Sequence, residues 1–551
     1  MSRLVRPPRL LRGAIAAVVV AVVLVCSVTF PASGATTARR VSASAPRVTT
    51  SGATTHLGFT LRSARRTTLG SVRVLLRPTC GPGAPGVILA TQRLTLTGRR
   101  AYAGKTVLAP GRWRAWVTWT RGGRPAHGPA TTFTVRATSG AAVAAVSPPA
   151  RNPKPTPTPA PTPLPTPTPT PAPAPTPTRV FGTLQSSTEH IATNRAAGIS
   201  LATFDVYWDR FEPVEGHVDA TYLSELKTRL ATYRAAGVQL VLSPGVQYPP
   251  SWLFSYPRSR FVNQYGDAYA PADVGKNVAD MVFNQCMRDK QQAYLGRLFA
   301  TLGTDFYGVR LGGGWYGELN YPDATYAGHT NSYWAFDPVA SGQVPGLPTG
   351  IPANPVPGWL PGTVSSNHAA AAQFSTWYLE ALRNYHDWQI RTARALYPGR
   401  LLMMYPSWGL RSGQLDAAVS ADLAGTTSAE RNGEVQRGFD FARYVRGITD
   451  PLVVVYTTWL DADASGDSGT DSRSWSPVKW LALLARDRAN PLAVMGENTG
   501  WAGRAQIDLA LGQARTFGLA AVMWAFEPQL YGSGYATVDD LATAIGLDRA
   551  G

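Results

Sequence analysis

The first third of this 551-residue chain lacks acidic residues altogether. Residues 1–188 contain 24 lysines and arginines but no aspartate or glutamate, and all 34 acidic residues follow, among 28 basic ones. Such a cationic region favours an anionic partner, such as a cell-envelope polymer or lipid head groups. We expect no nucleic-acid partner, because no nucleic-acid-binding motif or interleaved aromatic stacking pattern accompanies the arginines. An inert basic surface is the plainer alternative.

Cysteine is nearly absent, since the chain has only Cys26, Cys80 and Cys286. Cys26 lies in a segment that we expect to be removed, and the other two lie in segments assigned below to different domains. This scarcity argues against a disulfide framework. The 44% hydrophobic content is enough for a large buried core, which we expect to hold the fold together.

Long hydrophobic runs are also missing, apart from one between Ala14 and Phe30. Arginines precede this run, and the small residues Ser33 and Ala35 follow it, which is typical of a secretory signal peptide over residues 1–35. An uncleaved membrane anchor is the alternative, although a run of this length is slightly short for a membrane span. The sequence therefore predicts a secreted or cell-surface protein.

Proline recurs at almost every second position of the Pro/Thr-rich residues 150–178, which cannot form a packed core. We expect a stiff polyproline II linker of about 80 Å, at about 3.1 Å per residue. Before it, residues 46–138 contain short alternating segments broken by Gly- and Pro-rich turns. This pattern predicts a small all-β immunoglobulin-like sandwich, an accessory domain that spaces or binds.

After the linker, residues 179–551 alternate between apolar runs and helical patterns, the latter including 220–237, 289–303 and 371–396. The expected strands are residues 179–185, 199–208, 238–247, 306–314, 400–408, 452–459, 492–500 and 519–527. Eight strands alternating with helices predict an α/β fold, a (β/α)8 TIM barrel. An open doubly wound sheet is the alternative, but no G-x-G-x-x-G motif opens a helix after a strand.

Two glutamates stand at the carboxyl ends of expected strands, where barrel enzymes place their active sites. Glu318 follows the fourth strand in "GGGWYGELNYP", and Glu497 ends the seventh in "VMGENTG". One protonated and one ionised carboxyl group across a barrel mouth are what glycoside hydrolysis needs. The alternative is a pair of buried, hydrogen-bonded carboxylates without a catalytic role.

Aromatic and polar residues near the same strand ends suggest a sugar-binding cleft, because sugar rings stack on aromatic faces. The candidate substrate-binding residues are Asp205, Trp208, Trp252, Trp315, Tyr316, Asn320, Tyr321, Trp408, Trp459, Asn498, Trp524 and Glu527. A long Gly/Pro-rich insertion between Asp323 and His368 is expected to cover one side of the cleft, with Trp334 and Trp359 near outer sugar units. Arg310, inside the fourth strand, is expected to form an ion pair within the barrel.

We expect no cofactor and no metal site. The loop at residues 461–472 begins like a calcium loop, but its twelfth position is Ser472 rather than glutamate. A solvated acidic loop is the simpler interpretation, and the histidines show no metal-ligand spacing.

The barrel region resembles the family 42 β-galactosidases of glycoside hydrolase clan A. The stretches "FDVYWDRFEPVEGHVD", "VQLVLSPGVQYPPSWLF" and "FVNQYGDAY" carry the resemblance. It implies a retaining enzyme in which Glu318 is the acid/base and Glu497 the nucleophile. Clan A normally places asparagine before the acid/base, whereas this chain has Gly317.

The motifs "GELNYP" and "GENTG" are also similar to those of the family 14 β-amylases, and this resemblance implies inverting hydrolysis by the same two glutamates. Retaining β-galactosidase-like hydrolysis, inverting β-amylase-like hydrolysis and non-catalytic polysaccharide binding at the cell surface therefore remain as hypotheses. All three imply an oligo- or polysaccharide ligand.

Overall fold

The computed structural model describes residues 41–44, 46–51, 54–78, 86–107, 111–121, 124–127, 131–135, 179–363, 367–425 and 430–550. The expected signal peptide at residues 1–35 and the expected linker at residues 150–178 lie outside the described residues. Both therefore remain predictions. Among the described segments, no helix is both long and apolar enough to cross a membrane.

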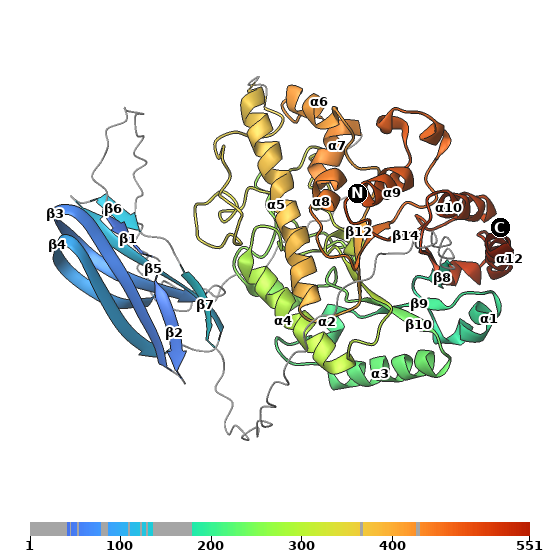
Figure 1. Ribbon diagram of the computed structural model, residues 1–551, viewed down its shortest axis with the longest axis horizontal. Helices are drawn as coiled ribbons and strands as arrows, with labels where there is room; N and C mark the ends of the chain where they lie inside the picture. The colour runs from blue at the N-terminus through green and yellow to red at the C-terminus, as the bar shows by residue number, and fades with distance from the viewer. Residues whose placement is uncertain are drawn as a thin grey trace, which may run out of the picture.

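The front unit is an antiparallel all-β structure, as predicted (Figure 1). Its strands are β1 (Ser42–Ala43), β2 (Arg47–Ser51), β3 (Thr54–Pro78), β4 (Gly86–Val107), β5 (Gly111–Arg121), β6 (Arg124–His127) and β7 (Thr131–Val135). The first half of β3 pairs with β1 and β2, its second half pairs with β5, and β4 follows it along both halves. Some of the short alternating segments expected from the sequence thus form one long strand, β3, whose register with β4 shifts between Ser63 and Thr67.

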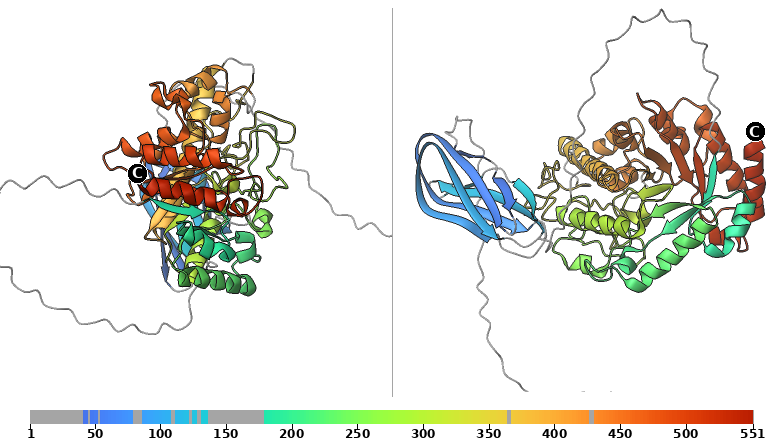
Figure 2. Two further views of the ribbon diagram at one scale, coloured as in Figure 1. Left: turned by 90° about the vertical axis from the view of Figure 1, so that its right-hand side faces the viewer. Right: turned by 60° about the horizontal axis from the view of Figure 1, so that its bottom comes forward.

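The second unit is a closed ring of eight parallel strands, which confirms the (β/α)8 barrel (Figures 1 and 2). The strands are β8 (Val180–Thr183), β9 (Leu201–Asp205), β10 (Gln239–Ser243), β11 (Gly308–Leu311), β12 (Arg400–Tyr405), β13 (Val453–Thr457), β14 (Val494–Glu497) and β15 (Ala521–Trp524). Each lies within one expected strand. The ring closes where β15 pairs with β8.

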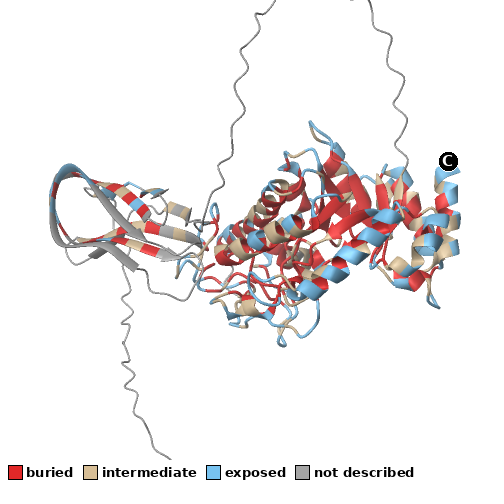
Figure 3. Ribbon diagram, turned by 90° about the horizontal axis from the view of Figure 1, so that it is seen from below, coloured by how far each residue is buried: buried red, intermediate tan, exposed pale blue. Residues whose placement is uncertain are grey.

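Helices surround the ring with their buried faces toward the strands and their exposed faces toward solvent (Figure 3). They are α1 (Ile191–Ala196), α2 (Trp208–Phe211), α3 (Ala220–Ala235), α4 (Gln285–Leu302), α5 (His368–Arg394), α6 (Gln414–Ser420), α7 (Glu430–Arg437), α8 (Phe441–Arg446), α9 (Pro477–Arg486), α10 (Arg504–Thr516), α11 (Glu527–Leu530) and α12 (Val538–Ala550). Side-chain caps start the longer ones: Asp219 accepts from the backbone of α3, Asn284 from α4 and Asn367 from α5.

The barrel start is fastened to its end through Arg179. This side chain donates to the carbonyl oxygens of Leu519 and Ala514, at 2.9 Å each, and forms an ion pair with Asp548 of α12. The ion pair is almost entirely buried on the Asp548 side. The first strand and the last helix are therefore linked at the seam where the ring closes.

The insertion after β11 packs around its own aromatic side chains. Trp334 is fully buried and donates from Nε1 to the carbonyl of Asp323, and Trp359 is also buried against Phe374. The expectation that these two tryptophans contact outer sugars is wrong, because their rings fill the insertion's interior.

Two interacting buried aspartates lie in this insertion and in the loop before α4. Asp337 Oδ1 accepts from the backbone of Val339, at 2.7 Å, and Asp280 Oδ1 accepts from Phe283, at 2.8 Å. The Oδ2 atoms of both aspartates are buried and have no hydrogen-bond partner among the described residues. Burial raises the pKa of Asp280, and the like charge of the Asp337 carboxyl group raises it further.

Cys286, near the start of α4, is buried and disulfide-bonded. The other two cysteines, Cys26 and Cys80, lie outside the described residues. Among the described residues the structure thus has one disulfide-bonded cysteine, which the prediction of a fold held by its core, without a disulfide framework, did not foresee.

Candidate active site

The inner face of the barrel becomes polar at the carboxyl ends of the strands. Side chains alternate between the two faces of a strand, and Met404, Met495 and Met523 belong to the apolar cluster inside the ring. By the same alternation Arg310 of β11 and Glu497 of β14 point inward. A charged layer thus lies directly above the apolar filling of the barrel.

Glu497, the last residue of β14, is held by donors from two strands. Its Oε2 accepts from the hydroxyl of Tyr456 on β13 at 2.7 Å, and Nη2 of Arg310 lies 3.1 Å from Oε1 and 2.9 Å from Oε2. Burial raises the pKa of Glu497, whereas Arg310 and the Tyr456 hydroxyl oppose that shift. Both donors favour the carboxylate form. The expected ion pair of Arg310 is therefore present, and its partner is a candidate catalytic residue.

Glu318 follows β11 after the short 3-10 turn η3 (Trp315–Gly317) and is half-buried. Its Oε1 accepts from Oγ1 of Thr458 at 2.8 Å, and its Oε2 lies 3.4 Å from Nδ2 of Asn320. Both donors are neutral. Burial raises the pKa of Glu318 to about 7; the Thr458 hydrogen bond opposes this rise, and the charge of Glu497 adds to it.

The two glutamates therefore differ as the two groups of a glycosidase must. Glu497 is paired with a cation, whereas Glu318 has neutral partners and a pKa near neutrality. An environment that separates two carboxyl groups in this way leaves one as a proton donor and the other as an anion. Because the charge of Glu497 acts on the pKa of Glu318, the two lie within electrostatic reach of each other.

Gly317 has a backbone conformation that favours glycine. Its φ of 85° lies in the left-handed region, where a side chain is strained. A Cβ at this position would also lie 3.1 Å from Nε2 of Gln247, in the loop after β10. The amide of Gln247, which is mostly buried, thus occupies the space beside Glu318 that a side chain at residue 317 would need.

Asp205 and Asn320 both lie near the glutamates. Asp205 ends β9, accepts from Oγ1 of Thr203 at 3.2 Å and contributes to the raised pKa of Glu497. Asn320 is buried, and its Oδ1 accepts from the backbone of Trp315 at 2.8 Å. Asn320 therefore holds the turn that carries Glu318.

Three expected sugar-binding aromatic residues are instead core residues. Trp208 is fully buried, stacks on Tyr294 and donates to Glu212. Tyr321 is fully buried and stacks on Tyr378, with ring centroids 3.9 Å apart. Trp524 belongs to the outer core cluster, because it occupies an outward position of β15. The expectation that these side chains contact a sugar is wrong, since none has a surface to offer it.

Asn498 and Glu527 are also engaged within the protein. Asn498 exchanges two hydrogen bonds with the backbone of Ala525, at 2.8 and 2.6 Å. The buried Glu527 accepts bonds from Thr183, Ser187, His190 and Asn194. Asn498 thus joins the ends of β14 and β15, and Glu527 joins the end of β15 to the beginning of the barrel. Both side chains are buried and spent on these contacts.

The remaining aromatic candidates keep part of their surface. Trp252, Trp315, Trp408 and Trp459 are half-buried, and Tyr316 is 54% exposed. Trp315 already packs against two cations, since Lys276 Nζ and Arg437 Cζ each lie 4.6 Å from its ring centroid. Tyr316 is therefore the most accessible of the expected aromatic residues.

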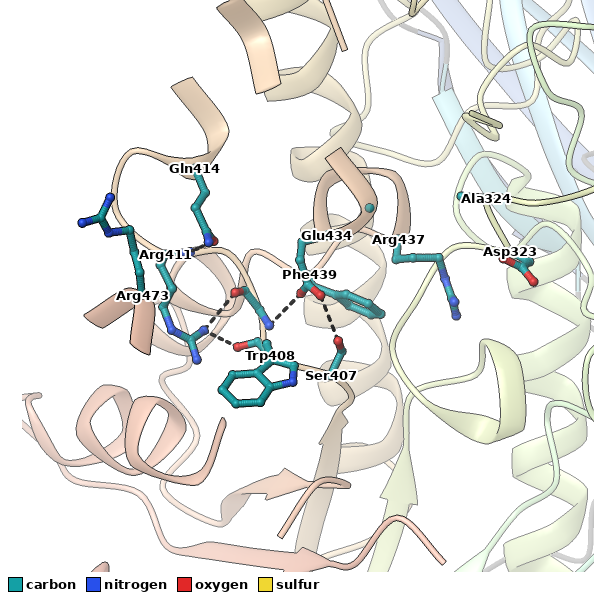
Figure 4. Close-up of a pocket in the computed structure, with 12 residues that line it drawn as sticks. Asp323, Ala324, Ser407, Trp408, Arg411, Gln414, Glu434, Arg437, Phe439 and Arg473 are labelled. Carbon is teal, nitrogen blue, oxygen red and sulfur yellow. Dashed lines mark hydrogen bonds between the residues drawn. The ribbon is translucent and has the colours of Figure 1, made fainter. Parts of the chain in front are cut away.

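A pocket of about 450 Å³ lies beside this centre, over the end of β12 (Figure 4). It is lined by Asp323, Ala324, Ser407, Trp408, Gly409, Arg411, Gln414, Gly433, Glu434, Arg437, Phe439 and Arg473. Arg437 connects it to the catalytic candidates, because its charge lowers the pKa of Glu318.

The carboxylates of the acidic loop at residues 461–472 accept hydrogen bonds from separate donors within the protein. Asp461 accepts from Thr499, Asp463 from Ser465, Asp467 from Ser476 and Asp471 from Arg473. In the part of the chain that the structure describes, no group of three or more metal-ligating side chains is present.

Sequence reasoning missed Tyr456, Thr458, Gln247 and Arg437. Tyr456 lies in the apolar run "LVVVYTTW", whose period does not show which face a residue occupies. Arg437 lies on a helix more than a hundred residues after Glu318, and nothing in a single sequence connects the two.

The closed ring of eight parallel strands defines a (β/α)8 barrel with two glutamates at its mouth. No family model and no curated protein matches the chain. Among solved structures, the chain is similar to the catalytic domain of β-amylase from Paenibacillus polymyxa, with 16% identity, a TM-score of 0.49, and coverage of 67% of this chain and 98% of that one.

Two β-galactosidases are also similar in structure. The enzyme from the Antarctic haloarchaeon Halorubrum lacusprofundi shows 15% identity and a TM-score of 0.41, with 67% of this chain and 58% of that one covered. The enzyme from Marinomonas ef1 shows 13% identity and a TM-score of 0.43, with 67% and 59% covered. The chain thus spans less than two thirds of either β-galactosidase. The assignment of the fold rests on the ring of strands itself.

Proposed function

We propose that this protein is a glycoside hydrolase in which Glu318 donates a proton and Glu497 acts as the anionic partner. The observation that carries the proposal is the contrast between the two side chains: Glu318 has neutral donors and a pKa of about 7, whereas Glu497 is paired with Arg310 and Tyr456. Glycosidic bond cleavage requires both properties at one site.

In the proposed retaining reaction, protonated Glu318 gives its proton to the glycosidic oxygen while a carboxylate oxygen of Glu497 attacks the anomeric carbon. The leaving alcohol departs, and the sugar remains bonded to Glu497. Glu318, now ionised, then takes a proton from water, whose oxygen displaces Glu497 and releases the sugar. The fixed position of Glu497 between Arg310 and Tyr456 supports its role as nucleophile.

A panel of aryl glycosides and natural oligosaccharides tests the activity, with β-galactosides and α-glucans included because of the two sequence resemblances. Proton NMR of the first product then gives the anomeric configuration. Retention supports Glu497 as nucleophile, and a 2-deoxy-2-fluoro glycoside should add its glycosyl mass to wild type but not to Glu497→Gln. Inversion would make Glu497 the base that activates water, as in the β-amylase-like hypothesis.

Turnover on no member of the panel, together with binding of an oligosaccharide, would favour the non-catalytic polysaccharide-binding barrel. Turnover that persists unchanged in Glu318→Gln would remove Glu318 from the mechanism and contradict the proposal.

We further propose that residues 1–35 direct export and that the basic front unit contacts an anionic cell-envelope polymer. The charge of the first 188 residues supports this proposal. Sedimentation of the full chain with purified cell walls at low and high salt tests it, since binding through exposed charge should weaken as salt rises.

A further inference from the structure

The guanidinium group of Arg437, at the end of α7, makes one hydrogen bond within the described residues. Its Nε donates to the carbonyl of Tyr321 at 3.0 Å, and its Cζ lies 4.6 Å from the ring centroid of Trp315 and 5.5 Å from that of Phe439. Within the described residues, no carboxylate oxygen lies within 4.0 Å of its nitrogens, and neither Nη atom makes a hydrogen bond. The group is therefore fixed in place without a direct ion pair among the described residues, although the charges of Asp323 and Glu318 act on it.

The other deeply placed arginines of the barrel are satisfied. Arg310 pairs with Glu497; Arg288 donates to Met281, Val282 and Asn384. Arg411 donates to four backbone carbonyls. Arg437 is half-buried; burial lowers its pKa, and the charges of Asp323 and Glu318 oppose this shift. Polar groups that are left without a direct partner in this way are candidates for ligand binding.

The guanidinium faces the pocket over β12. Figure 4 shows Arg437 with no dashed line reaching it, whereas Glu434 of the same helix is bonded to Ser407 and Gly409. Asp323, the other acid of the lining, accepts from the backbone of Thr325. The volume of about 450 Å³ is sufficient for a sugar ring, and the half-buried Trp408 offers it an aromatic surface.

We propose that this pocket binds an anionic sugar unit, a uronate or a sulfated sugar, whose charged group forms paired hydrogen bonds with the two Nη atoms of Arg437. The planar guanidinium fork matches carboxylate and sulfate geometry. The inference rests on the proposed hydrolysis, since it names the class of substrate that the same site receives. The anionic unit lies beside Glu318, on whose charge Arg437 already acts.

Calorimetric titration with trigalacturonate and with its neutral methyl ester tests the inference, because the two ligands differ only in charge and the added methyl groups. Galactose 6-sulfate and galactose form the sulfated arm, and inorganic sulfate alone is the third. We expect wild type to bind one of the anionic sugars at least tenfold more tightly than its neutral counterpart. Arg437→Gln should remove this preference, and Arg437→Lys should keep only part of it.

Arg446→Gln is the matched control, because Arg446 ends α8 with an exposed side chain and lies outside the pocket. It should bind like wild type. Equal binding of charged and neutral ligands by wild type would overturn the inference. So would inorganic sulfate that binds as tightly as the anionic sugars, or an unchanged preference in Arg437→Gln.

Failure of the two proposals can be told apart, because binding is measured without turnover. If wild type prefers anionic sugars but hydrolyses no glycoside, the inferred binding site is supported and the proposed activity is contradicted. Hydrolysis of neutral glycosides without a charge preference would have the opposite meaning.

Discussion

The barrel contains two pairs of interacting carboxyl groups, and they are built in opposite ways. Glu318 and Glu497 stand at the mouth, where every carboxylate oxygen has a donor within 3.4 Å. Asp280 and Asp337 lie inside the loop layer, and each has one oxygen with no partner. Burial raises the pKa of all four groups.

The difference shows that a shifted pKa does not identify a catalytic pair. The aspartates are almost wholly buried, and the charges of Arg288 and Arg258 act on them without forming ion pairs within the described residues. They have no route to a substrate, whereas Glu318 keeps part of its surface exposed in the mouth. Accessibility together with separate stabilisation of the two charges is what distinguishes the glutamate pair.

The largest expected effect is on activity. Glu318→Gln should lower kcat/KM by about 10³-fold on substrates with poor leaving groups, because general-acid catalysis contributes roughly 10²–10⁴-fold. The value of kcat/KM on aryl glycosides with acidic phenols should fall much less, because these leaving groups need no proton. Initial rates across a leaving-group series measure this.

Asp280→Asn is the counterpart from the buried pair and should change kcat/KM less than threefold. A loss as large as that of Glu318→Gln would mean that the two pairs do not differ as the structure indicates.

The next effect concerns the stability of the mouth. Arg310→Met leaves Glu497 buried with only the Tyr456 hydroxyl, and breaking a buried ion pair from one side costs about 3–5 kcal/mol. Urea unfolding followed by tryptophan fluorescence measures the change in the free energy of unfolding. Arg504→Met removes an exposed ion pair with Asp508 and should have almost no effect, in line with surface pairs generally.

The aspartate pair should make stability fall as the pH rises. The pKa of Asp337 is raised to about 6 and that of Asp280 well above its ordinary value, so the folded state holds protons that the unfolded state releases near pH 4. Their contribution is complete below pH 4 and is lost as the pH passes through about 6 and above, on the order of 2 kcal/mol.

Asp337→Asn should therefore be more stable than wild type at pH 8, because one like charge is gone and an amide can donate to Asp280. Urea unfolding at pH 5 and pH 8 compares the two proteins. A variant that is less stable at both pH values would contradict this interpretation of the pair.

A smaller effect is expected at Gly317. Gly317→Ala places a Cβ at a φ of 85° and against the amide of Gln247, which should cost about 1 kcal/mol and displace Glu318 slightly. Thermal unfolding and kcat measure the two consequences. Gly216→Ala, also at positive φ but with open space around it, separates strain from crowding.

The smallest effect is a shift in pH dependence. Activity should fall as the pH rises through about 7, because Glu318 must be protonated to act as the acid. Arg437→Gln removes a positive charge that lowers the pKa of Glu318, so the alkaline limb of the kcat profile should move to higher pH. A limb that moves to lower pH would show that Arg437 does not act on Glu318 through its charge.

The barrel could be predicted from the sequence because its strands are short apolar runs buried on both faces, and parallel strands have this composition. Each of the eight apolar runs contains one strand of the barrel. The positions of Glu318 and Glu497 at the strand ends could be predicted from these runs. The assignment to the family 42 β-galactosidases, the domain boundaries and the catalytic roles remain predictions.

The aromatic residues could not be assigned in the same way, because a tryptophan one position along a strand faces the opposite side. Trp524 packs against helices, while its neighbour Ala525 faces the barrel interior. The length of the strands in the front unit was also underestimated. The turn-like residues around Ser63 shift the register of β3 without ending the strand.

The anchoring of Arg179 has a mechanical consequence. Any tension that the preceding chain transmits to the barrel arrives at a residue attached to Leu519, Ala514 and Asp548. The load is therefore shared between the first strand and the last βα unit, instead of peeling β8 from the ring. Such a pull would act on the seam of the barrel and not on the strand ends that hold Glu318 and Glu497.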